Sequence, residues 1–255
     1  MRQLNPKVQY SQCSRILPLF HRAEARSIAA ALTRAMVTMP AAACRAFDMG
    51  EGDTYLNAAG RSALLRSAHE AACEGVAMKL RPWHFGDADH VDRAKELFAR
   101  HLQCLAANVA LVPSAAYAVS TVAANVVLRE GEQIVVTEDH YASVLPWQHR
   151  ADRSGATVVA VRHLRPPHAS LEGGSTTAAI LDKICERTAV VSAPPCCWTD
   201  GELIDLGLIS AACRRVGAAL VVDATQWVGA MPFSVGGSGE AEPGGQGAQP
   251  DAVIV

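Results

Sequence analysis

A carboxylate stands directly after a buried apolar run in the C-terminal part of the chain. The residues Leu220, Val221 and Val222 predict a β-strand, and Asp223 follows them. Burying a charged carboxylate costs free energy unless a partner compensates it. A protonated heterocyclic nitrogen of a ligand is one such partner. The alternative is that Asp223 is a structural residue that caps a turn.

Two further polar positions follow apolar runs. Ser114 stands between the run 110–112 and a helical pattern, and Ala115 and Ala116 come next. Free N–H groups and the positive end of a helix attract phosphate, and small side chains let it approach. Simple N-capping by Ser114 is the alternative. His140 follows the run 133–137. A lone histidine at the end of a strand is more often a structural residue than a ligand-binding one.

The elements that must position these residues alternate along the chain. Hydrophobic periodicity predicts helices over 67–80, 91–105, 115–128, 141–154, 177–185 and 206–216. Apolar runs predict strands over 110–112, 133–137, 157–161, 188–192, 219–222 and 251–255. Short, continuous strands between helices are typical of an α/β fold, a mainly parallel sheet with helices on both faces. Ligands of such folds bind at the carboxyl ends of the strands, where Ser114, His140 and Asp223 are expected.

The composition excludes several classes of protein. Of the 255 residues, 50% are hydrophobic and 19% are charged, which excludes a disordered chain. The formal net charge of -2 gives no indication of a nucleic-acid partner. No apolar run approaches the length that crosses a bilayer, so no membrane association is expected.

Cysteine usage indicates a reducing compartment. The eight cysteines are scattered through apolar segments, and no secretory signal precedes them, so we expect an intracellular protein. Cys196 and Cys197 are adjacent rather than in a CxxC motif, and no second ligand pair follows them. The sequence therefore predicts no metal site.

The two ends of the chain differ from its middle. Residues 1–47 contain seven Lys or Arg residues and one acid, which fits either a transit peptide or an ordinary basic extension. The expected location is therefore cytoplasmic, mitochondrial or plastid. Residues 236–250 are rich in Gly and predict a flexible loop. We expect the remaining domain to span residues 48–255, including this loop.

The segment around Asp223 carries a resemblance to a known family. The run Asp223-Ala-Thr-Gln226-Trp-Val-Gly229-Ala-Met-Pro232 resembles the class V aminotransferase superfamily of pyridoxal-phosphate enzymes, which includes cysteine desulfurases and isopenicillin N epimerase-like proteins. Further segments are similar in the same order, namely 55–60, 112–120, 138–147 and 191–206. The resemblance runs from about Tyr55 to Val255, and implies the large domain of the fold-type I enzymes of pyridoxal phosphate.

The resemblance implies roles for the residues around the cofactor ring. Asp223 would pair with the pyridinium nitrogen and keep it protonated, so that the ring accepts electrons. His140 would stack on the ring, and Gln226 would donate a hydrogen bond to its phenolic oxygen. The backbone at Ser114, Ala115 and Ala116 would bind the phosphate. These six residues are the expected cofactor-binding set.

The same resemblance implies the chemistry and the partners. Asn57 would face a small amino-acid substrate, and the full-length reaction would be transamination, epimerisation or elimination. Relatives are homodimers, so a homodimer is expected for the full-length form. Trp198 occupies a place where many relatives have Asn, which favours the epimerase-like branch over a close cysteine desulfurase.

Lysine usage departs from the family pattern. The four lysines are Lys7, Lys79, Lys95 and Lys183, and all of them precede Asp223. The Schiff-base lysine of the family lies after the strand that 251–255 resembles. We therefore expect a C-terminally truncated and inactive chain that lacks the catalytic lysine and the small C-terminal domain. A non-catalytic binding or assembly partner of a complete family member is the alternative.

Overall fold

The computed structural model describes residues 45–48, 55, 57, 58, 60–84, 90–163, 175–235 and 250–255. The chain forms two compact units: residues 1–56 with 62–82, and residues 57–61 with 83–255. The expected extension 1–47 lies outside the described residues except for positions 45–47, as does the expected loop 236–250 except for Pro250. Among the described residues, no helix is both long and apolar enough to cross a bilayer.

The first unit contains helix α3 (Arg66–Met78), close to the predicted range 67–80. The Arg66 guanidinium lies 2.6 Å from Asp48 Oδ1, and its backbone N–H donates to the Ala46 carbonyl over 2.8 Å. None of the helix residues is buried. These two contacts connect the described residues before the helix to its first turn.

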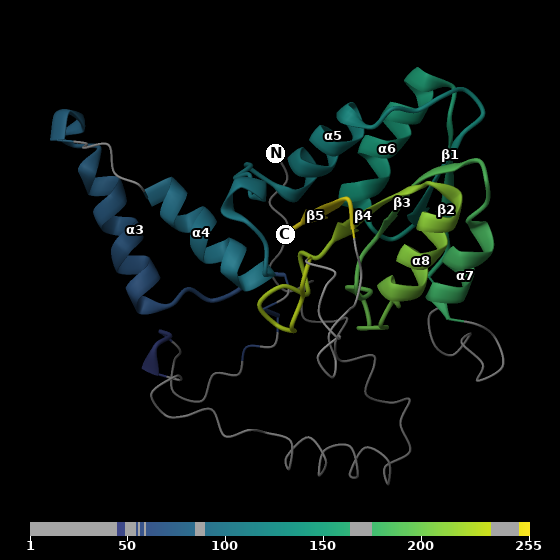
Figure 1. The fold of residues 1–255 in the computed structure, drawn as a ribbon. Coiled ribbons are helices and arrows are strands. Elements are labelled where there is room, and N and C mark those ends of the chain that lie inside the picture. Colours follow the sequence, from purple (N-terminus) through teal and green to yellow (C-terminus); the bar gives the residue numbers. More distant parts are fainter. Residues whose placement is uncertain are drawn as a thin grey trace, which may run out of the picture. The chain divides into compact units, whose positions relative to one another are not determined.

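The second unit is built on a parallel sheet of five strands in the order β2-β1-β3-β4-β5 (Figure 1). The strands are β1 (Gln133–Thr137), β2 (Thr157–Val161), β3 (Thr188–Ala193), β4 (Ala219–Asp223) and β5 (Ala252–Ile254). Each neighbouring pair is parallel. The predicted α/β fold class is confirmed, and these five strands end within one residue of their predicted bounds.

One predicted strand is wrong. Residues 110–112 form no strand and lie between the short helix η5 (Ala106–Asn108) and α5 (Ala115–Asn125). Leu111 and Val112 are exposed. An apolar run becomes a strand only where a neighbouring strand completes its hydrogen bonds, and none of the described strands pairs with this run.

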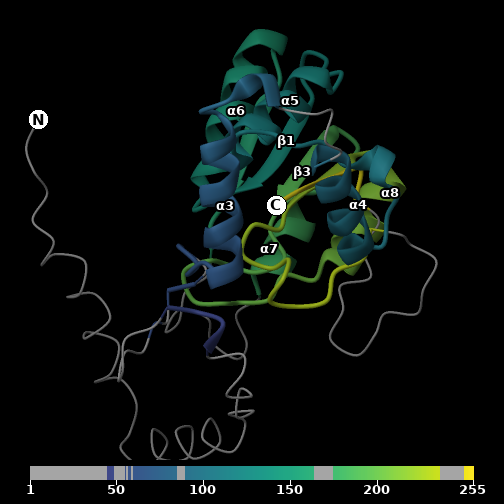
Figure 2. The same ribbon diagram turned by 90° about the vertical axis from the view of Figure 1, so that its left-hand side faces the viewer.

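Helices cover both faces of the sheet (Figures 1 and 2). On one face, α5 and α6 (Tyr141–Ser154) pack on Ile134 and Val136, with Trp147 fully buried. On the other face, α7 (Thr176–Lys183), α8 (Leu206–Val216) and α4 (His90–Leu102) pack on Val135 and Val191. Successive residues of each strand thus point to opposite faces, which explains why both kinds of position are apolar.

Local capping sets the ends of these helices. Ser114, Ser175 and Asp205 accept hydrogen bonds at the first turns of α5, α7 and α8. Gly155 and Gly217 end α6 and α8 with φ of 73° each, a conformation that favours glycine. Helix α5 stops at Asn125, before its predicted end at 128, because Val126 is extended.

Candidate functional site

Two residues that are far apart in the sequence meet at the carboxyl edge of the sheet. His140 follows β1 and Asp223 ends β4, with β3 between the two strands. His140 Nδ1 lies 3.6 Å from Asp223 Oδ2, and both side chains are buried. Parallel strands place their carboxyl ends at one edge, so the topology brings this pair together.

The two oxygens of Asp223 have different surroundings. Oδ1 accepts hydrogen bonds from the Thr225 backbone N–H over 3.1 Å and from the Thr225 hydroxyl over 2.6 Å. Oδ2 faces His140 and has no hydrogen bond to a described residue. The turn-capping interpretation of Asp223 thus accounts for one oxygen and leaves the other available to a ligand.

Neighbouring residues hold His140 in place. Its Nδ1 lies 3.4 Å from the Ser143 hydroxyl. The indole N–H of Trp198 donates to the Asp139 carbonyl over 3.0 Å. Trp198 therefore ties the segment after β3 to the residue immediately before His140.

The start of α5 offers free backbone donors. The Ser114 hydroxyl accepts from the Tyr117 N–H over 3.2 Å, so Ser114 is the N-cap of α5. This was the alternative to phosphate binding that the sequence left open. The N–H groups of Ala115 and Ala116 have no hydrogen bond to a described residue. Such donors at a helix start suit an anion.

Asp223 points to the same side of the sheet as α5. Val221 packs in the core under α5 and α6, whereas Val222 packs in the core under α7 and α8. Because strand residues alternate, Asp223 faces the α5 and α6 side. Ser192 pairs in register with Val221, and its buried hydroxyl has no hydrogen-bond partner among the described residues. Unsatisfied acceptors and donors on this side fit a cofactor with a cationic ring nitrogen and polar substituents.

The remaining predicted residues lie in turns. Gln226 is half-buried in the turn after β4, where the Trp227 N–H donates to the Ala224 carbonyl over 2.9 Å. Asn57 is exposed, and its carbonyl accepts from the N–H groups of Gly60 and Arg61. Their roles, like those of the other site residues, remain predictions.

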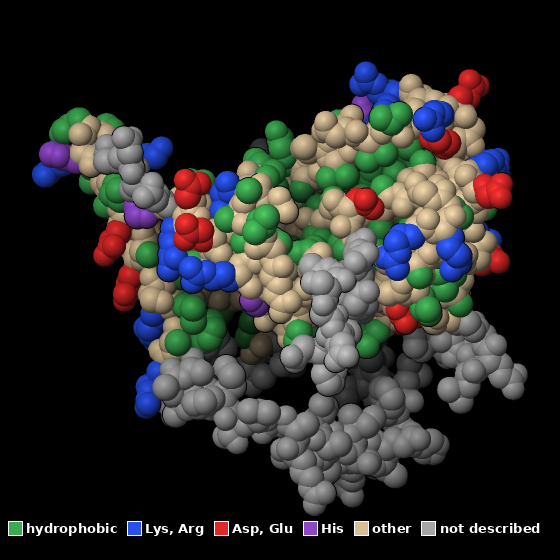
Figure 3. All heavy atoms as spheres, viewed as in Figure 1, with side chains coloured by type: hydrophobic (Ala, Val, Ile, Leu, Met, Phe, Trp, Pro, Cys, Tyr) green, Lys and Arg blue, Asp and Glu red, His purple; other side chains and the backbone are tan. Residues whose placement is uncertain are grey.

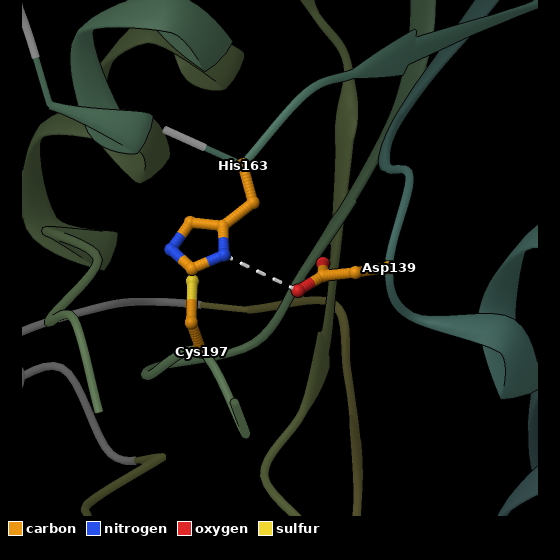
Figure 4. A group of neighbouring side chains, drawn as sticks. All are labelled: Asp139, His163 and Cys197. Carbon is orange, nitrogen blue, oxygen red and sulfur yellow. Dashed lines mark ion pairs between the residues drawn. The ribbon is translucent and has the colours of Figure 1, made fainter. Parts of the chain in front are cut away.

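A second group of polar side chains occupies the same edge. The ligand atoms of Asp139, His163 and Cys197 lie within 4.8 Å of one another (Figure 4). They follow β1, β2 and β3, which are neighbours in the sheet. His163 Nδ1 lies 3.4 Å from Asp139 Oδ2, and the His163 side chain is 2% exposed. We call these three residues the 139–163–197 cluster.

A short hairpin delivers Cys197 and two further carboxylates. Cys196 and Leu203 form an antiparallel bridge, and Gly201 turns the chain with φ of 78°. Asp200 Oδ2 and Glu202 Oε2 lie 3.3 and 2.9 Å from His163 Nε2. Neither contact has hydrogen-bond geometry, because Nε2 has no hydrogen-bond partner among the described residues.

The electrostatics of the cluster disfavour a free thiolate. Burial, together with the negative charges of Asp139, Glu202 and Asp200, raises the pKa of Cys197 to about 12. The sequence did not reveal this cluster, since its residues stand in no ligand spacing. The only indication in the sequence was that His163 and Asp139 each follow a predicted strand.

Comparisons with known proteins support the family resemblance. The sequence profile described as Aminotransferase class-V matches residues 83–239. The 8-amino-7-oxononanoate synthase of Mycobacterium sp. (strain JLS) is 30% identical over 232 residues, which is 89% of this chain and 55% of that protein. The chain therefore spans about half the length of this curated relative.

Solved structures share the fold. The cysteine desulfurase CsdA from Escherichia coli has a TM-score of 0.63 and 20% identity, covering 78% of this chain and 52% of that chain. The cysteine desulfurase from Thermococcus onnurineus NA1 has a TM-score of 0.63 and 17% identity, covering 78% and 51%. The cystine C-S lyase C-DES has a TM-score of 0.62 and 20% identity, covering 72% and 50%. Together with the family match, these similarities confirm the resemblance and support pyridoxal phosphate as the cofactor.

Proposed function

Since the chain belongs to the class-V aminotransferase family, we propose that it forms the cofactor-binding part of a pyridoxal-phosphate protein that acts on an amino acid. The reaction proposed for the whole protein is a transamination, an epimerisation or an elimination. An intracellular location is part of the same proposal.

One observation carries the proposal: the buried approach of His140 to Asp223 at the carboxyl edge. A lone buried carboxylate is costly, and the imidazole at 3.6 Å is too far to form a hydrogen bond with it. A cationic ring nitrogen at Oδ2 would compensate the charge. The imidazole beside it offers a flat surface for the ring to stack on.

Each residue then has a distinct task. Asp223 holds a proton on the ring nitrogen, and the backbone at Ser114, Ala115 and Ala116 binds the phosphate. Gln226 donates to the phenolic oxygen, and Asn57 orients the amino-acid substrate. When bound, the cofactor withdraws electrons from the carbon that carries the substrate's amino group.

The lysines described in the second unit do not suit a covalent role. The Lys183 carbonyl accepts from the side chain of Gln133, the first residue of β1, so Lys183 lies at the amino edge of the sheet. Its ammonium group pairs with Asp182 over 2.8 Å. Lys95 lies on α4 with Nζ 3.9 Å from Asp92. We propose that this chain holds the cofactor without a covalent bond to either of them.

A homodimer is part of the proposal. Figure 3 shows apolar side chains at the surface over α5 and α6. Tyr117 and Leu145 are 56% and 69% exposed there. Apolar surface of this kind suits burial against a second subunit. Light scattering on the purified chain would measure its mass directly.

The test is a titration of the 255-residue chain with pyridoxal phosphate, followed by absorbance and by quenching of tryptophan fluorescence. His140→Ala should weaken binding about tenfold, because stacking contributes roughly 0.5–1.5 kcal/mol beyond the buried area. His149→Ala is the matched control, since His149 is an exposed histidine on α6. It should bind like the unchanged chain.

Borohydride reduction tests the non-covalent part of the proposal. Treatment of the cofactor-loaded chain should leave no stoichiometric label on one lysine peptide. Equal affinities of the unchanged chain and the His140→Ala variant would contradict the proposed stacking. Stoichiometric trapping on Lys95 or Lys183 would contradict the non-covalent binding.

A further inference from the structure

The 139–163–197 cluster contains two buried polar atoms without hydrogen bonds to described residues, one beside Nδ1 of the His163 ring and the other at Nε2. Asp139 Oδ2 and His163 Nε2 are buried without a hydrogen-bond partner among the described residues. Leaving such a group unpaired costs free energy, and a metal ion beside Nδ1 would supply the missing partner of Asp139 Oδ2. Figure 4 shows the Asp139 carboxylate, the imidazole and the Cys197 sulfur converging on one small volume.

We propose that Asp139, His163 through Nδ1, and Cys197 bind a zinc ion. One carboxylate oxygen, one imidazole nitrogen and one thiolate are zinc ligands, and a water molecule would complete the tetrahedron. On binding, the Cys197 thiol loses its proton to solvent as the sulfur–zinc bond forms. Nothing in this proposal depends on pyridoxal phosphate.

The distances suit a tetrahedral ion after a small adjustment. Zinc bonds of about 2.0–2.3 Å place neighbouring ligand atoms roughly 3.3–3.8 Å apart. His163 Nδ1 and Asp139 Oδ2 are already 3.4 Å apart. The widest separation in the cluster is within 4.8 Å, so a closure of about 1 Å is enough. The Thr199 hydroxyl is hydrogen-bonded to Nδ1 over 3.4 Å, and a zinc ion on Nδ1 would replace this hydrogen bond.

The surroundings of the second ring nitrogen support Nδ1 as the ligand atom. Metal-bound histidines usually direct their other N–H to a carboxylate, which fixes the ring orientation. Glu202 Oε2 lies 2.9 Å from Nε2 without hydrogen-bond geometry, so a rotation of the ring on metal binding would have to complete this hydrogen bond. Glu202 is itself held, because the Thr176 N–H and hydroxyl donate to its two oxygens over 2.8 and 2.7 Å.

The carboxylates around His163 create a negative environment that attracts a cation. The carboxylates of Asp139, Asp200 and Glu202 all lie within 3.4 Å of the imidazole of His163. Within the described ranges, their only ion pairs are those with His163. A zinc ion offsets two of these charges and the Cys197 thiolate adds one, so bound zinc leaves the same net charge as a single imidazolium does. The negative charge therefore attracts a cation but does not by itself select zinc.

The experiment measures zinc binding to the full chain after treatment with a chelator. Zinc is titrated against a chromophoric chelator, and the bound metal is counted by mass spectrometry. Cys197→Ser should lose one equivalent of tightly bound zinc and at least tenfold in affinity. Cys196→Ser is the matched control because Cys196 is adjacent in sequence but not in the cluster. It should retain the unchanged stoichiometry.

Cobalt(II) provides a spectroscopic readout of the ligands. The unchanged chain should show sulfur-to-cobalt charge-transfer absorption and the intense visible bands of a tetrahedral site. Cys197→Ser should lose the charge-transfer band, and His163→Gln should lose the tetrahedral spectrum. Far-ultraviolet circular dichroism of each variant checks that it remains folded.

Several results would overturn the proposal. One is equal zinc stoichiometry in Cys197→Ser and the unchanged chain. Another is loss of the charge-transfer band in Cys196→Ser instead. A third is a melting temperature that zinc does not raise in the unchanged chain, since a ligand of the native state must stabilise it. That last result would identify His163 as a simple ion-pair partner of the carboxylates.

Discussion

The two histidines at the carboxyl edge have opposite surroundings although their segments are neighbours. His140 stands near one carboxylate, Asp223, whose second oxygen remains available. His163 stands among three carboxylates and next to a thiol. Asp139 and His140 are consecutive residues, yet one belongs to the cluster and the other to the pair. The same edge thus holds both the proposed site for the cofactor ring and the proposed site for a metal ion.

The difference follows from which strands meet. The pair joins β1 to β4 and faces α5 and α6, whereas the cluster joins β2, β1 and β3, with Cys197 in the core under α7 and α8. Because the pair and the cluster lie toward different faces of the sheet, a substitution can disrupt one of them without touching the other. The two regions should therefore respond independently to mutation.

The largest effect is expected from Asp223→Asn. The variant keeps an oxygen for Thr225 but loses the charge, so pyridoxal phosphate should bind more than about a hundredfold more weakly, at roughly 3 kcal/mol. Zinc affinity should stay unchanged. Fluorescence and chelator titrations on the same sample measure both. Asp152→Asn on α6 is the control, since Asp152 is exposed and bonds only to Gln148 among the described residues.

The Cys197 thiol of the cluster should react about a hundredfold more slowly than the exposed Cys185 thiol. A hydrogen bond from the Arg187 backbone lowers the pKa of Cys185, whereas burial raises the pKa of Cys213 to about 11 and that of Cys197 to about 12. Since the thiolate is the reactive form, we expect the order Cys185, Cys213, Cys197 at pH 8. Iodoacetamide labelling of the chelator-treated chain, read by peptide mass spectrometry, measures it. Fast labelling of Cys197 would show that the cluster is open to solvent.

Glu202→Gln should weaken zinc binding by at least tenfold. Loss of a carboxylate beside a metal-bound histidine typically costs 10–100-fold in affinity. The tetrahedral cobalt spectrum should persist, because the three proposed ligands remain. Glu186→Gln is a suitable control on an exposed carboxylate. An unchanged zinc affinity in Glu202→Gln would indicate that Glu202 has no role in orienting His163.

The smallest effect is expected at the residue that links the two regions. Trp198→Phe removes the hydrogen bond to the Asp139 carbonyl. We expect the free energy of unfolding to fall by about 1 kcal/mol, measured in urea. Both ligands should bind somewhat more weakly, since the segment of Asp139 and His140 loses a support. A loss of only one of the two affinities would show that Trp198 serves a single region.

The fold was largely predictable from the sequence because its elements are locally encoded. Short β-branched runs such as 133–137 and 157–161 gave the strands, and Gly217 ended a helix where expected. The run 110–112 was misjudged, since hydrophobicity alone does not provide a neighbouring strand. Helix 115–128 ended early for a similar reason, because periodicity continued beyond the point where the backbone became extended.

The pair and the cluster differ in how far the sequence determined them. His140 and Asp223 were singled out in advance, because a polar residue after a buried strand is visible in the sequence and the motif around Asp223 is specific. That Oδ2 of Asp223 stays open while Oδ1 binds Thr225 was visible only in the structure.

The sequence by itself determined the five strands of the sheet, the helices that follow them and the residues of the pair, since these depend on neighbours along the chain. Only the tertiary structure decided the cluster. Asp139, His163 and Cys197 have no informative spacing, and they meet because the strand order places β2, β1 and β3 side by side. Parallel strands joined by helices bring distant residues to one edge, and that order is set by packing rather than by any local pattern.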